Sequence, residues 1–160
     1  MKTYFLVLTF FLFSFPLFAA QEKVPEILSV KGFLYYHGVG GWSENIFNPD
    51  FNIWNSSIGE GSLKHPSNRT LFVIEANKNT STKADSVFIK IQKKVKDKIE
   101  ILYEKKHKFS FLEENQNMHV PVFLESTTFG EFIVTAYICD FLGKKISPIK
   151  ESSVKYGGGE

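Results

Sequence analysis

The chain has 160 residues, of which 43% are hydrophobic and 22% are charged, enough for one domain with a packed core but not for two. Its 19 basic and 17 acidic residues nearly balance, which argues against nucleic acid as the main partner. Cys139 is the only cysteine, so no disulfide can form within the chain and packing must hold the fold together.

The first twenty residues have the composition of a secretory signal peptide. Lys2 gives a positive start, residues 4–18 are almost entirely apolar, and Ala19 and Ala20 are small. An uncleaved membrane anchor is the alternative, but Pro16 interrupts the run and a span needs roughly 20 apolar residues. We therefore expect cleavage after Ala20, no stable membrane span in the mature protein, and a periplasmic or secreted location.

Beyond the leader, apolar residues recur at every second position, as in strands with one buried face. Residues 71–74 are instead a continuous apolar run, as in a strand that is covered on both sides. Pro121 lacks an amide donor, which predicts an edge strand. Polar turn sequences separate the runs, and together they predict an all-β sandwich. In chain order, the alternating apolar sets are Val87, Ile89 and Ile91; Ile99, Ile101 and Tyr103; Met118, Val120, Val122 and Leu124; and Phe132, Val134, Ala136 and Ile138.

One of these runs resembles a known kind of domain. Residues 130–138 read Gly-Glu-Phe-Ile-Val-Thr-Ala-Tyr-Ile and are followed by Asp140 and Gly143. This stretch is similar to the penultimate strand and following turn of bacterial immunoglobulin-like modules, where a Gly-x-aromatic-x-Val-x-Ala run precedes an Asp and a Gly. The resemblance covers about 14 residues and implies an immunoglobulin-like antiparallel β-sandwich, but it implies no function.

The sequence divides into four expected parts. The signal peptide spans 1–20, and an aromatic and glycine-rich segment, 21–62, packs on the sandwich. Residues 63–155 form the sandwich core. Residues 156–160 form a flexible tail, because three of the five are glycine.

The aromatic and glycine-rich segment is the candidate ligand-binding region. It contains both tryptophans, Trp42 and Trp54, and six of the eleven glycines. Aromatic faces on glycine-rich loops can stack on sugar rings or hold a hydrophobic peptide, and the candidate binding residues are Tyr35, Tyr36 and Trp42. The simpler interpretation, which we favour, is that these rings fill the open end of the sandwich. We expect Trp42, beside glycines and polar residues, to be exposed, and Trp54, in a strand-like stretch, to be buried.

No catalytic or metal-binding pattern is present in the sequence. Residues 37–41 are similar to the glycine-rich oxyanion loop of esterases, but the Gly-x-Ser-x-Gly nucleophile elbow is missing. The four histidines have no spacing typical of metal ligands. The sequence therefore predicts no enzyme activity, no metal and no cofactor.

A lysine-rich stretch spans residues 93–108. It could contact anionic lipid, polysaccharide or an acidic protein. The simpler interpretation is an exposed hairpin whose lysines prevent edge-to-edge aggregation. The lysines are Lys93, Lys94, Lys96, Lys98, Lys105, Lys106 and Lys108.

Two functional hypotheses follow from these patterns, and a third, an enzyme whose site is assembled from distant residues, has no positive feature in the sequence. The first is an exported, non-enzymatic accessory or binding module of the bacterial envelope, which binds a partner protein through a sheet edge or the aromatic segment. The alternative is a carbohydrate-binding module that uses Trp42, Trp54 and the neighbouring Tyr35 or Tyr36.

Overall fold

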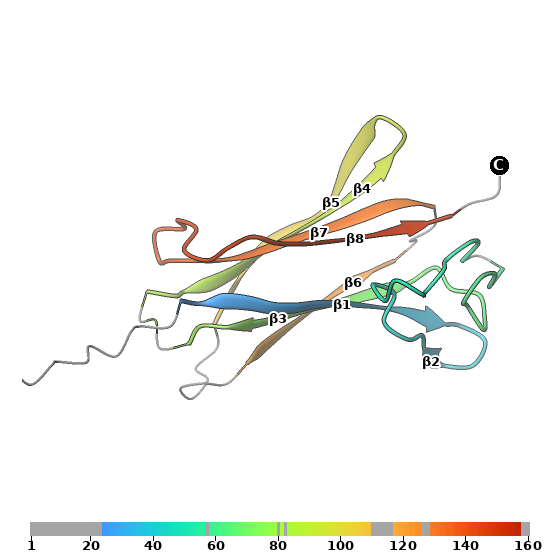
Figure 1. Cartoon of the computed structure of the whole chain (residues 1–160), viewed down its shortest axis with the longest axis horizontal. Coiled ribbons are helices and arrows are strands. Elements are labelled where there is room, and N and C mark those ends of the chain that lie inside the picture. The colour runs from blue at the N-terminus through green and yellow to red at the C-terminus, as the bar shows by residue number, and fades with distance from the viewer. Residues whose placement is uncertain are drawn as a thin grey trace, which may run out of the picture.

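The computed structural model describes residues 24–56, 58–79, 81, 83–109, 117–125 and 129–157, so the predicted leader lies outside the described residues. All regular structure in the described part is β-strand (Figure 1). Accordingly, these residues include no helix that could cross a membrane. The strands are β1 (Glu26–Tyr36), β2 (Gly41–Trp42), β3 (Thr70–Asn77), β4 (Ser86–Val95), β5 (Lys98–Lys108), β6 (Met118–Leu124), β7 (Gly130–Cys139) and β8 (Lys150–Tyr156).

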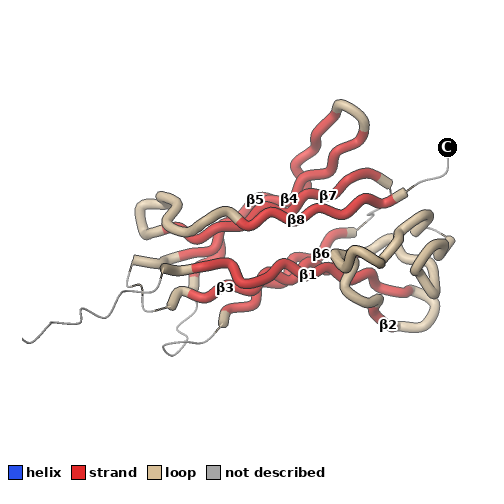
Figure 2. Tube along the Cα trace, viewed as in Figure 1, coloured by secondary structure: helices blue, strands red, loops and turns tan. Residues whose placement is uncertain are grey.

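The strands form two four-stranded antiparallel sheets. Sheet I has the order β2-β1-β3-β6, and sheet II has the order β5-β4-β7-β8. The sheets lie one above the other as two layers, and the loops that follow β2 gather at one end of sheet I (Figure 2). The predicted all-β fold with two facing antiparallel sheets is confirmed.

The core consists of the inward-facing residues of both sheets. Along β7, alternate residues Val134, Ala136 and Ile138 are fully buried, as predicted. Sheet I contributes Phe72 and Ile74 from β3, which are also fully buried. Because side chains alternate along a strand, each sheet supplies one apolar face to the core and leaves the other outside.

In sheet I the prediction of an edge strand is confirmed, but the prediction that residues 71–74 are covered on both sides is wrong. The strand that contains Pro121, β6, is at an edge, as expected for a residue without an amide donor. The run 71–74, by contrast, is not covered equally on both sides. Phe72 and Ile74 face the core, whereas Leu71 and Val73 face outward and are only partly buried.

The prediction for residues 99–103 is wrong because the register shifts by one residue. Ile91 pairs with Tyr103, but the next residue of β4, Gln92, pairs with Ile101, so Leu102 has no registered partner. A one-residue shift transfers the following side chains to the other face of the strand. Ile101 and Ile99 therefore lie on the outer face of sheet II, on the same side as Gln92. They are 56% and 59% exposed.

The expected segment boundaries also differ from the structure. β1, which falls in the segment 21–62 expected to pack on the sandwich, is an inner strand of sheet I between β2 and β3. Tyr156, expected in the flexible tail 156–160, ends β8 and is almost fully buried. Its hydroxyl forms a hydrogen bond of 2.9 Å with the hydroxyl of Thr70, which joins sheet II to sheet I. Residues 158–160 lie outside the described residues.

The first prediction tests the register of β7. Val134→Asp places a carboxylate in the core, where desolvation costs several kcal/mol, so we expect the variant not to fold. Thr135→Asp is the matched control, because Thr135 is on the opposite face and only partly buried. We expect this control to lose about 1 kcal/mol or less. Circular dichroism and thermal unfolding measure both. A Val134→Asp variant that melts like the parent would show that the register is wrong.

The second prediction concerns pH. Burial raises the pKa of the Tyr156 hydroxyl above its usual value of about 10. The folded protein thus disfavours the phenolate, so the stabilisation is complete below about pH 10 and is lost as the pH rises further. At pH 8 we expect Tyr156→Phe to lower the free energy of unfolding by about 1 kcal/mol through loss of one hydrogen bond. Urea unfolding at pH 8 and 11 should show this difference shrinking. A difference that stays constant would contradict the prediction.

Candidate functional site

An aromatic cluster lies on the outer face of sheet I. Tyr35 of β1 is the registered partner of Trp42 of β2, so the two side chains share one face. One row further along, Phe33 pairs with Leu71, and Leu71 pairs with Phe123 of β6. Phe33 and Tyr35 are two residues apart on β1, which places both rows on the same face. We call these five residues, Phe33, Tyr35, Trp42, Leu71 and Phe123, the aromatic face.

The rings of the aromatic face contact one another and remain accessible. The ring centroids of Tyr35 and Trp42 are 5.0 Å apart with an interplanar angle of 62°. Those of Trp42 and Phe123 are 6.4 Å apart at 85°. Trp42 is 46% exposed and Phe123 is 47% exposed, so the predicted exposure of Trp42 is confirmed. Large apolar residues exposed together are typical of interaction surfaces.

The glycine-rich sequence 37–41 makes the turn that places Trp42 beside Tyr35. The amide of Gly40 donates to the carbonyl of Tyr36 at 3.0 Å, and Gly40 has a φ of +68°, which is costly for residues with a Cβ. After the turn, Ser43 fixes the returning chain. Its amide donates to the carbonyl of Leu34, and its hydroxyl accepts from the amide of Leu34 at 2.8 Å. The stretch that is similar to an oxyanion loop is therefore a hairpin turn.

Tyr36 is separated from the other two predicted binding residues. It follows Tyr35 directly, so alternation turns its side chain to the inner face, where it is 5% exposed. There its ring meets the ring of His65 edge-on, with centroids 5.6 Å apart. Tyr36 is a core residue, and the expectation that it presents its ring on the binding surface is corrected. Tyr35 and Trp42 are the pair that the structure brings together.

The prediction that Trp54 is buried is wrong, because its neighbour Ile53 takes the inward position. Ile53 is 2% exposed and bridges to Tyr156 and to Gly61, whereas Trp54 is 55% exposed. The expected strand is also absent: Ile53 forms only isolated bridges, and Trp54 lies in a bend. The interpretation that the tryptophan rings fill the open end of the sandwich is therefore wrong for both. It holds for other rings of the segment, because Tyr36 is in the core and Phe47 and Phe51 pack against it, beside the buried side chains of Ile46, Ile53 and Leu63.

Phe123 and Leu71 are members of the aromatic face that the sequence-based prediction missed. Phe123 alternates with the buried residues Val122 and Leu124, so the pattern does predict that it faces outward. An outward phenylalanine on an edge strand is the signal that could have identified it. The pattern does not show that β6 pairs with β3, and this pairing is what brings Phe123 close to Trp42.

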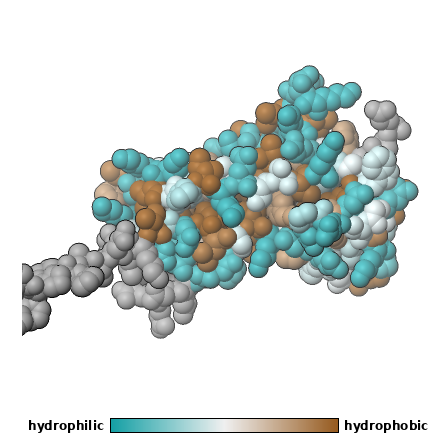
Figure 3. Space-filling view, viewed as in Figure 1, coloured by the Kyte–Doolittle hydropathy of each residue, from teal (hydrophilic) through white to brown (hydrophobic). Residues whose placement is uncertain are grey.

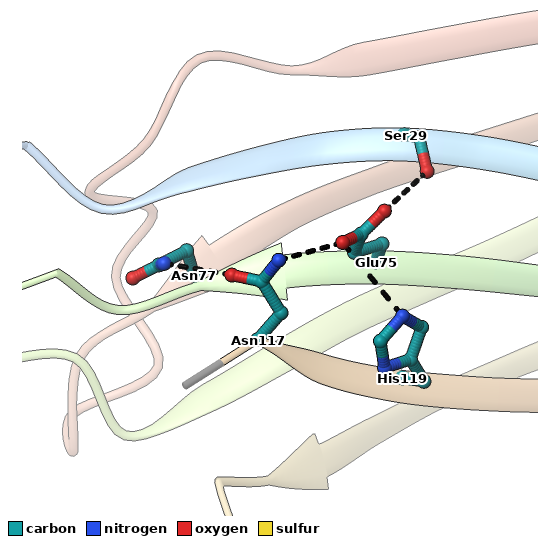
Figure 4. A network of polar contacts seen from close by, with 5 residues as sticks. All are labelled: Ser29, Glu75, Asn77, Asn117 and His119. Atoms are coloured by element: carbon teal, nitrogen blue, oxygen red, sulfur yellow. Dashed lines mark hydrogen bonds and ion pairs between the residues drawn. The ribbon is translucent and has the colours of Figure 1, made fainter. Parts of the chain in front are cut away.

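The opposite end of the same face carries a polar network (Figure 4). The carboxylate of Glu75 accepts hydrogen bonds from Ser29 at 2.9 Å and Asn117 at 2.6 Å, and it lies 3.7 Å from the ring of His119. The amide of Asn77 donates to Asn117 at 2.8 Å. The hydrogen bond from Ser29, aided by Asn117 and His119, lowers the pKa of Glu75 despite partial burial. The outer face of sheet I is thus apolar at one end and hydrogen-bonded at the other.

The described residues contain no group of three or more His, Cys, Asp or Glu that could hold a metal ion. Cys139 is buried, and burial raises the pKa of its thiol. Comparison with known proteins found no matching family model, no matching curated protein and no matching solved structure.

The third prediction tests whether the side chains of Trp42 and Trp54 lie on the surface and that of Tyr36 lies in the core. Replacing Trp42 or Trp54 with Ala should cost about 1 kcal/mol or less, because half of each side chain is already in solvent. Tyr36→Ala is the comparison and should cost about 3–5 kcal/mol, because it empties part of the core. Urea unfolding gives the free energies. Equal losses for Trp42→Ala and Tyr36→Ala would contradict the placement of Trp42.

Proposed function

We propose that this chain is an exported, non-enzymatic binding module of the bacterial envelope, and that it binds a partner protein through the aromatic face. The observation that carries the proposal is the contact between the half-exposed rings of Trp42 and Phe123 beside Tyr35. Tryptophan and tyrosine contribute most to binding energy when they lie in the centre of an interface. Export to the periplasm or the cell exterior is supported by the composition of residues 1–20.

The geometry of the rings favours a protein over a sugar at this surface. Neighbouring rings are tilted by 62° and 85°, so the cluster presents faces and edges in several directions. A sugar ring stacks best on one flat open face, whereas apolar side chains of a protein pack well between tilted rings. The carbohydrate alternative assumed that Trp42 and Trp54 act together. In the described structure, Trp42 has ring contacts with Tyr35 and Phe123, and none with Trp54.

The sheet edges are less suited to a partner than the aromatic face. Edge strand β6 carries Pro121, which has no amide to donate to an added strand. Edge strand β5 carries four lysines, which oppose strand addition. The end of β8 is already bonded, because the amide of Gly157 donates to the carbonyl of Ile53 at 2.7 Å. Strand addition at β5, at β6 or at the end of β8 is therefore less favourable than binding through the aromatic face.

The strand order supports the immunoglobulin-like type of sandwich. In such domains strands C, F and G form one sheet, which variable-type domains extend with C′, while A, B and E belong to the other sheet. The order β5-β4-β7-β8 matches C′-C-F-G, and β1-β3-β6 matches A-B-E. Sandwiches of this type host many functions, so the proposed activity depends on the aromatic face and not on the fold.

The fourth prediction tests this proposal with envelope extract passed over the immobilised protein. We expect a defined protein to be retained by the parent and by Trp54→Ser, and to be lost with the double variant Trp42→Ser/Phe123→Ser. Removal of two central aromatic anchors should weaken binding at least tenfold. Light scattering of the parent alone tests whether the partner is a second copy of the chain. Retention of the same protein by the double variant, or of no specific protein by the parent, would contradict the proposal.

A further inference from the structure

The β4–β5 hairpin protrudes from sheet II (Figure 1), and a recess lies beside its turn, away from the aromatic face. It is an open groove of about 1350 Å³. Three segments line it, namely the hairpin turn 94–98, the start of β7 at 129–131 and the end of β8 at 155–157, together with Trp54. The hairpin and β7 belong to sheet II, whereas Trp54 comes from the segment between β2 and β3. The groove therefore forms only in the folded chain.

Aromatic rings form part of the groove wall. Trp54 is 55% exposed and Phe129 is 52% exposed, and both line the groove. Neither ring is needed to close the core, because the neighbouring Ile53 and Phe132 already occupy the buried positions. Two accessible aromatic rings in a recess are suited to hold a flat apolar surface of a ligand.

The remaining wall carries a surplus of positive charge. Lys94, Lys96, Lys98 and Lys155 line the groove, against the two acidic residues Asp97 and Glu131. Hydrophilic side chains gather at the tip of the hairpin (Figure 3). In the part of the chain that the structure describes, the two ion pairs are Arg69–Glu125 and His119–Glu75, and neither contains a lysine. The amino group of Lys93 adds a further charge, 5.3 Å from the ring centroid of Phe129.

We infer that this groove binds an acidic polysaccharide, a chain of sugar rings that carry carboxylates. Sugar rings would stack on Trp54 and Phe129, while the lysines of the hairpin turn would pair with the carboxylates. The combination of exposed aromatic rings with lysines favours an acidic polysaccharide over other ligands. A neutral glycan gains nothing from the positive charge, an acidic peptide offers flat rings only where it carries aromatic residues, and a flat lipid surface does not fill a recess.

This site is independent of the proposed partner-protein surface, because the two share no residue. Trp42 belongs to the aromatic face and Trp54 to the groove. Substitutions in one surface therefore leave the other as an internal control, and the two proposals can fail separately.

The experiment measures binding of oligogalacturonate to the purified protein by calorimetry and tryptophan fluorescence. We expect binding that weakens as salt rises, because salt screens exposed charges. Trp54→Ala and the double variant Lys96→Gln/Lys98→Gln should each weaken it at least tenfold. The matched controls Trp42→Ala and Lys144→Gln, which are exposed but outside the groove, should bind like the parent. Circular dichroism verifies that each variant is folded.

Four outcomes would overturn the inference. One is the absence of binding by the folded parent, and a second is equal binding of a neutral cello-oligosaccharide of the same length. A third is binding that neither Trp54→Ala nor the lysine variant weakens. The last is tighter binding of polyglutamate or of phosphatidylglycerol vesicles than of oligogalacturonate, which would assign the groove to an acidic peptide or a lipid surface.

Discussion

Packing of the two inner sheet faces against each other is the constraint on which the rest of the structure depends. With a single cysteine the chain cannot form an internal disulfide, so its stability comes from burying one face of each sheet. The buried hydrogen bond between Thr70 and Tyr156 adds a polar link between the layers. Once these faces are committed to the core, strand alternation decides which side chains remain outside. Tyr36 is in the core and Tyr35 is on the surface for this reason alone.

The sequence predicted the fold well where the alternation is local and uninterrupted. In β7 the set Val134, Ala136 and Ile138 could be assigned to the core because the strand keeps one register throughout. The prediction failed in β5, where a shift of one residue exposes Ile99 and Ile101. Such a shift depends on pairing with β4, and a single strand's sequence does not contain that information.

The same limit applies to the candidate sites. Tyr35 and Trp42 could be predicted as a pair, because a short glycine-rich turn separates them. Phe123 joins them only because β6 pairs with β3 across a long stretch of sequence. Trp54 was misplaced because Ile53 and Trp54 are both apolar, and only the contact of Ile53 with the end of β8 decides which one faces inward. The sequence therefore predicts the site residues that a local turn brings together. It does not predict those whose position depends on pairing between distant segments of the chain.

The segment between β2 and β3 links the two candidate surfaces through the core. Ile46 and Ile53 anchor it, and both are almost fully buried. Ile46 lies over Gly32 of β1, where a Cβ would be only 2.7 Å from the isoleucine side chain, so this glycine allows close packing. Gly32, one of the glycines that suggested binding loops, thus serves to bring the segment against the sandwich. A segment held in this way can present Trp54 at the groove, and can fix the chain directly after Trp42 of β2, with little ordering cost on binding, which favours affinity at both surfaces.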